Sequence, residues 1–96
     1  MNYTVKEGIV LTKICGEWFL IPTREASETS PHILRLQLPS VFVWQMLKKG
    51  KSRNEMLNVL GILLHKQERE AEGVLDTILS SFIARNMLVK KSVPPR

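Results

Sequence analysis

The apolar residues change their period at Pro39, and this change restricts the fold more than any other feature of the sequence. Before Pro39 they occur in short runs rich in β-branched and aromatic residues, which is typical of strands. After Pro39 they recur three and four positions apart, which is typical of amphipathic helices. A chain of 96 residues has room for one core. We therefore expect one α+β domain over residues 1–89, with helices covering one face of a small sheet.

The first part of the chain predicts a three-stranded antiparallel β-meander. Residues 5–23 form a hairpin in this interpretation, with a turn at Cys15-Gly16-Glu17. Pro22 ends the second strand because proline has no N–H to give to the ladder. The polar residues 23–31 predict a surface loop, and residues 32–36 alternate well enough to form a third, short strand.

Three helices follow in the second part of the chain. The first begins near Pro39 and is apolar almost all round, so we expect it to be central and buried. Gly50 ends it, and Ser52 with Glu55 forms a capping box for the second helix. The third helix covers residues 68–85 and ends at Asn86, which tolerates a left-handed conformation.

The apolar face of the third helix covers about half of its circumference, which is wider than a single contact needs. Burial against two neighbouring elements explains this width. The functional alternative is that one edge of the face, near Val74 or near Leu79 and Ile83, lines an open groove. The residues concerned are Ala71, Val74, Leu75, Ile78, Leu79, Phe82 and Ile83.

Signals for catalysis, metal binding and cofactor binding are weak throughout the chain. Cys15 is the single cysteine, at a strand end where a small buried apolar residue is the default. The two histidines, His32 and His65, lie far apart, and no glycine-rich phosphate-binding motif is present. We therefore expect no enzyme activity, no metal and no cofactor. A lone cysteine, short apolar runs and no export signal favour a cytoplasmic protein with no membrane partner.

The net charge of +5 is concentrated in two places, residues 48–53 and the tail of residues 90–96. Such runs are usually solvated turns or tails, and we interpret them so. The tail also contains Pro94-Pro95, which favours a flexible segment. A nucleic-acid footprint is the alternative interpretation of the basic clusters.

Several segments together resemble a known family. Residues 7–11 (EGIVL) and 15–23 (CGEWFLIPT) resemble the opening hairpin of proteins similar to pyrroloquinoline-quinone synthesis protein D. Residues 33–36 and 43–52 (VWQMLKKGKS) resemble its third strand, aromatic-bearing first helix and following turn. The end of the third helix, with Asn86-Met87-Leu88, resembles the closing pattern. The chain departs from the family at Gln37, at residues 39–41 and at Asn86.

The resemblance implies a winged-helix-like recognition element that acts as an adaptor or chaperone in natural-product biosynthesis. Such a protein binds the leader segment of a ribosomally made precursor peptide and presents it to a modifying enzyme, often a radical S-adenosylmethionine enzyme. The leader adds a strand beside the third strand and places apolar side chains in a groove against the third helix. By position, the resemblance implies that the strand contacts are His32, Ile33, Leu34, Arg35 and Leu36. The groove wall would be formed by Leu75, Ile78, Leu79 and Phe82. Both Arg35 and Arg85 would meet acidic leader residues.

Strand addition also makes physical sense, because the unpaired edge of a meander offers free N–H and C=O groups. On this hypothesis Leu34→Pro removes an edge donor and abolishes peptide binding.

Two other functions stay open. One is a winged-helix DNA-binding module, for which the second helix with Arg53, Asn54 and Asn58 is the better candidate, since the third helix begins with several acids. The other is a scaffold or homodimer formed through the same edge strand.

Overall fold

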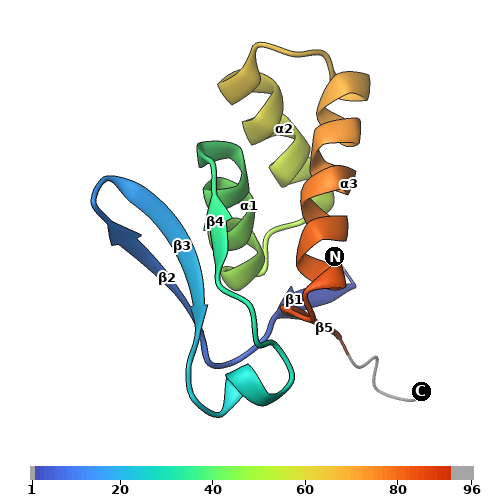
Figure 1. The fold of residues 1–96 in the computed structure, drawn as a ribbon. Coiled ribbons are helices and arrows are strands. Elements are labelled where there is room, and N and C mark those ends of the chain that lie inside the picture. Colours follow the sequence, from blue (N-terminus) through green and yellow to red (C-terminus); the bar gives the residue numbers. More distant parts are fainter. Residues whose placement is uncertain (1, 92–96) are drawn as a thin grey trace, which may run out of the picture.

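A computed structural model describes residues 2–91 and confirms the α+β fold, with the helices on one side of a three-stranded antiparallel sheet (Figure 1). The elements are β1 (Tyr3–Val5), β2 (Ile9–Ile14), β3 (Glu17–Pro22), a short 3-10 turn (Ala26–Glu28), β4 (Leu34–Leu36), α1 (Leu38–Lys48), α2 (Arg53–Leu64), α3 (Glu68–Ala84) and β5 (Leu88–Lys90). The predicted hairpin, third strand and three helices therefore all form, but the third strand begins at Leu34, so His32 and Ile33 lie in the segment before it.

The main sheet has the order β2-β3-β4, as a meander requires. The two-residue turn Cys15-Gly16 joins β2 to β3, with positive φ angles of 51° and 79°. Two positive φ angles match the right-handed twist of the flanking strands. The prediction that Cys15 is buried is wrong, because this turn places its side chain in solvent.

A second, two-stranded ribbon was not predicted. In it β1 pairs antiparallel with β5, and Tyr3 lies opposite Lys90. Val5 therefore belongs to β1 and not to the hairpin, and Lys90 belongs to a strand and not to the tail. The N–H of Lys91 donates to the carbonyl of Asn2 at 2.7 Å, which extends the ribbon. The rest of the predicted tail, residues 92–96, lies outside the described residues.

Each of the three helices in the described residues ends in the same way. A residue with positive φ follows the last turn: Gly50 (75°), His65 (52°) and Asn86 (56°). The next N–H then donates to a carbonyl five residues back, from Lys51 to Met46, from Lys66 to Gly61 and from Met87 to Phe82, at 3.0, 3.0 and 2.9 Å. This is the Schellman arrangement, which satisfies carbonyls that the helix leaves free.

The start of α2 forms half of the predicted capping box. The hydroxyl of Ser52 accepts from the N–H of Glu55 at 3.2 Å. The Glu55 carboxylate does not complete the box but lies 3.6 Å from the ammonium group of Lys51. An exposed pair of this kind contributes little to stability.

The core lies around α1. Trp44 is 2% exposed and Phe82 is 1% exposed, and their rings meet edge to face with centroids 5.3 Å apart. Leu20 and Leu36 of the sheet are also buried in this core. The helix α1 is not buried all round, however, because Phe42 is 36% exposed. Trp18 packs half-buried against this core, with the Lys13 ammonium group 5.6 Å from its ring centroid.

Gly8 joins the two sheets, and we expect Gly8→Ala to be the most destabilising glycine substitution of the chain. Its φ is 83°, and an added Cβ would lie 2.8 Å from Thr23 Oγ1 and 3.0 Å from Ala26 Cβ. Left-handed strain costs about 1–2 kcal/mol, and overpacking adds about 1–3 kcal/mol. Guanidinium denaturation of the purified variant measures the change in the free energy of unfolding.

Two other glycines separate these costs. Gly16 has a φ of 79° and no heavy atom within 4 Å of an added Cβ, so Gly16→Ala carries the strain alone. Gly73 is helical and equally open, so Gly73→Ala should stabilise α3 by about 1 kcal/mol. Equal losses for Gly8→Ala and Gly16→Ala would contradict the close approach around Gly8.

Candidate functional site

A pocket of about 370 Å³ lies between the segment that leads into β4 and the C-terminal end of α3. Its lining residues are His32, Ile33, Leu34, Ala84 and Arg85. Four of these were predicted from the sequence, and the fold brings them together from segments about fifty residues apart. We call this pocket, together with the free edge of β4, the β4–α3 groove. Ile33 is 62% exposed beside it.

The alternation of hydrogen-bonded and non-bonded residue pairs along the sheet shows which backbone groups point toward its free edge. The N–H of Thr23 donates to the carbonyl of Gly8 at 2.7 Å, so these two residues form a bonded pair. Bonded and non-bonded pairs alternate along an antiparallel ladder. It follows from the β2–β3 register that Glu17, Phe19 and Ile21 direct their N–H and C=O groups toward β2. Trp18 and Leu20, which lie between them, direct theirs toward β4.

The same alternation assigns the groups of β4. Leu34 and Leu36 lie opposite Leu20 and Trp18, so their N–H and C=O groups bond to β3. Arg35 lies opposite Phe19, and its N–H and C=O groups point outward from the sheet. The expectation for Leu34→Pro therefore needs a correction: that substitution breaks the β3–β4 ladder, and the outward donor belongs to Arg35.

The side chains of β4 alternate between the core and solvent. Leu36 is buried and Leu34 half-buried on the core face, while Arg35 is exposed on the other face. The Arg35 guanidinium lies 3.2 Å from the Glu17 carboxylate, and both side chains are more than half exposed. An exposed pair contributes about 0–1 kcal/mol, so Arg35 can exchange Glu17 for another carboxylate at little cost.

The four predicted groove-wall residues of α3 do not line this pocket. Leu75, Ile78, Leu79 and Phe82 are all less than 10% exposed and belong to the core. Packing against α1 and α2 covers most of the wide apolar face. At one edge of that face, however, Ile83 is 43% exposed and lines, with Leu79, a separate pocket of about 390 Å³. The part of α3 that lines the β4–α3 groove is its last turn, where the Arg85 guanidinium donates to the hydroxyl of Ser81 at 3.1 Å. The sequence offered one sign of this, because the residues at positions 81 and 84 are small and leave space beside the last turn of α3.

A hydrogen-bond network around the buried Ser30 hydroxyl holds the two sides of the groove together. Ser30 is 0% exposed, and its hydroxyl donates to the carbonyl of Asn86 at 2.6 Å. The Lys6 ammonium group donates to Ser30 Oγ at 3.0 Å and also to Thr29 Oγ1. The Asn86 amide donates to the carbonyl of Thr29 at 3.0 Å. The loop before β4 is therefore fixed to the end of α3, and no sequence pattern indicated this.

The basic cluster of residues 48–53 is partly neutralised. Lys51 pairs with Glu55, and the Arg53 guanidinium lies 2.9 Å from the Asp76 carboxylate. Arg53 thus has a partner within the fold, but this exposed pair contributes little, as does the pair of Arg35 with Glu17. Among residues 2–91, no three His, Cys, Asp or Glu side chains are grouped to hold a metal ion. None of the helices in this range is long and apolar enough to cross a membrane.

The fold has a counterpart among solved structures. TbiB1, solved in complex with the TbiA(beta) leader peptide, matches with a TM-score of 0.73 over 94% of this chain and 99% of that chain. The two sequences are 16% identical, so the likeness establishes a shared fold. No family model and no curated protein matches this sequence.

We expect Ser30→Ala to lower the free energy of unfolding by about 0.5–1.5 kcal/mol, because the Asn86 carbonyl loses the buried Ser30 hydroxyl as its donor. Denaturant titration followed by tryptophan fluorescence measures this. Ser27→Ala is the matched control, because Ser27 lies in the same loop and its hydroxyl bonds to the Arg24 carbonyl in an exposed position. A loss for Ser30→Ala as small as that for Ser27→Ala would show that the network does not hold the groove.

Proposed function

We propose that this chain is a non-catalytic module that binds the leader segment of a ribosomally made precursor peptide. The peptide adds as a strand to the free edge of β4, and the module presents it to a modifying enzyme of the radical S-adenosylmethionine type in the cytoplasm. The observation that carries the proposal is the outward-facing backbone of Arg35 at the edge of the β4–α3 groove.

The sheet geometry supports strand addition. An unpaired N–H and C=O on an edge strand are a template for a further chain, and a flanking pocket selects its side chains. The shared fold with TbiB1, which was solved with a leader peptide, and the family resemblance agree with this use of the edge.

The lining residues indicate which leader residues suit the groove. Ile33, Leu34 and Ala84 offer apolar surface, so an apolar leader side chain is expected between β4 and α3. Arg85 and His32 also line this pocket, whereas the Arg35 side chain lies on the opposite face of β4, toward which the neighbours of an apolar residue in an added strand point. We therefore expect acidic residues on either side of the apolar one. Leu36, Leu75, Ile78, Leu79 and Phe82 act from the core by holding β4 and α3 in place.

The module needs a partner to carry out chemistry on the bound peptide. The residues that line the pocket of the β4–α3 groove, His32, Ile33, Leu34, Ala84 and Arg85, include no Ser, Cys, Lys or carboxylate nucleophile, so we assign the groove to binding. Modification of the peptide is therefore assigned to a separate enzyme, and the family resemblance indicates the radical type.

We expect Arg35→Pro to weaken leader binding by about tenfold or more, because it removes the outward N–H and leaves a peptide carbonyl without a donor. Proline is tolerated on an edge strand where its missing N–H faces solvent. Fluorescence anisotropy with a labelled leader, from a small open reading frame encoded beside this protein, measures the dissociation constant.

Two control variants distinguish loss of the Arg35 backbone N–H from loss of its side chain and from loss of the fold. Arg35→Ala keeps the N–H and removes only the exposed guanidinium, so we expect a smaller loss, of about fivefold or less. Leu34→Pro should destabilise the fold itself, because that N–H belongs to the β3–β4 ladder. Unchanged leader binding by folded Arg35→Pro would exclude strand addition at β4.

Salt dependence distinguishes the peptide-binding function from the nucleic-acid alternative. We expect leader affinity to change by less than about tenfold between low and physiological salt, because backbone hydrogen bonds and apolar contacts are weakly screened. Binding of a random DNA duplex, measured in parallel, should fall steeply if it occurs at all. Tight duplex binding with no leader binding would favour the DNA-binding alternative.

A further inference from the structure

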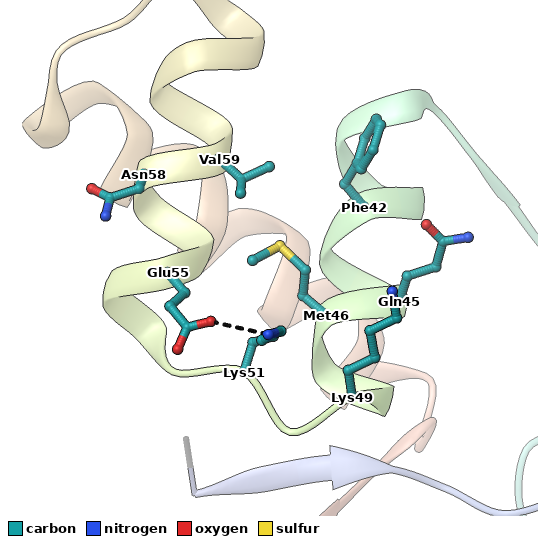
Figure 2. Close-up of a pocket in the computed structure, with 8 residues that line it drawn as sticks. All are labelled: Phe42, Gln45, Met46, Lys49, Lys51, Glu55, Asn58 and Val59. Carbon is teal, nitrogen blue, oxygen red and sulfur yellow. Dashed lines mark ion pairs between the residues drawn. The ribbon is translucent and has the colours of Figure 1, made fainter.

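A second groove, of about 560 Å³, lies between α1 and α2 (Figure 2). We call it the α1–α2 groove. Met46 from α1 and Val59 from α2 point into the space between the two helices, and Phe42 lies at its upper end. None of the residues lining it lines the pocket beside β4.

Each helix presents a regular stripe of side chains to this groove. On α1 the stripe is Phe42, Gln45, Met46 and Lys49, at positions i, i+3, i+4 and i+7. On α2, Glu55, Asn58 and Val59 have the same spacing, and Ile62 continues it beyond the groove. Residues at these intervals share one face of a helix. The two stripes thus lie on either side of the α1–α2 groove, and a groove of this shape can accept a third helix.

The apolar residues of these stripes remain accessible to solvent. Phe42 is 36% exposed and Ile62 is 78% exposed. Met46 and Val59 are half-buried at the bottom of the groove. Apolar surface gathered in a groove and bordered by polar residues is characteristic of a protein-binding site.

The charges around the groove have one dominant sign. Lys49 and Lys51 line it, and the single carboxylate in its lining, Glu55, already pairs with Lys51 at 3.6 Å. Lys48 and Lys49 also line an adjoining hollow of about 430 Å³ between the hairpin and α1, which shares Gln45 with the groove. An acidic partner is therefore attracted to this surface. The apolar floor and the paired lysine suit a protein segment better than a phosphate backbone.

We propose that the α1–α2 groove binds an amphipathic helix of a partner protein, one whose apolar face is flanked by acidic residues. Apolar side chains three and four positions apart on that helix enter between Phe42, Met46 and Val59. Carboxylates on its flanks meet Lys48 and Lys49. Because the two grooves share no lining residue, peptide and partner helix can be bound together. If the proposed leader-binding function holds, this is where the modifying enzyme docks.

The test uses the full chain labelled with ¹⁵N and two synthetic amphipathic peptides of about 18 residues. Both carry leucines at helical spacing; one has glutamates and the other lysines at every flanking position. We expect the acidic probe to shift the amide signals of residues 42–49 and 55–62 and to bind about tenfold more tightly than the basic probe. The signals of residues 32–36 should not move.

Matched variants locate the interaction. Met46→Glu places a charge on the groove floor and should weaken the acidic probe about tenfold. Lys49→Glu should reverse the preference between the probes, whereas Lys90→Glu, the same change in β5, should not. The inference is overturned by equal affinity for both probes, by no binding, or by shifts confined to residues 32–36 and 84–85. The inference would also be overturned if a DNA duplex, and neither peptide probe, shifted the signals of residues 42–62. Leader binding is measured separately and tests the β4–α3 groove.

Discussion

The edge-to-face contact between Trp44 and Phe82 joins α1, which supports the sheet, to α3, which borders the β4–α3 groove. Both rings are almost completely buried, so their burial contributes several kcal/mol and leaves little room for adjustment. Because α1 also packs against β4, the distance between β4 and α3 is set through α1 as well as by the hydrogen bonds that join Ser30 and Thr29 to Asn86. The space between them can stay open for this reason.

Local chemistry accounts for most of what the sequence predicted about the fold. The hairpin and the three helices follow from periodicity, and two of the three helix ends follow from Gly50 and Asn86, residues that accept a positive φ. At the end of α2 the positive φ falls on His65, a residue that adopts this conformation less often than glycine, so the sequence signal there is weaker. The β1–β5 ribbon was missed because strands of three residues are too short to show an alternating pattern, and their pairing depends on the finished fold.

The site was partly predictable, for a different reason. Residues 32–34 and Arg85 were identified by resemblance, and the fold places them around one pocket. The direction in which each N–H points depends on the phase of the β2–β3 ladder, which a sequence pattern does not contain. For α3, a wide apolar face is compatible with two packing neighbours or with one neighbour and a groove. Only the packing shows that Leu75 and Phe82 are covered and that the last helical turn is exposed.

The β1–β5 ribbon has a topological consequence. Tyr3 and Lys90 lie opposite each other, so the backbone enters and leaves this unit at points about 5 Å apart. A domain with adjacent entry and exit points can be grafted into a surface loop of a host protein without stretching either connection. Both grooves lie on elements other than the ribbon, so such a graft would leave them accessible. The architecture of this unit is therefore compatible with insertion between two segments of a host chain.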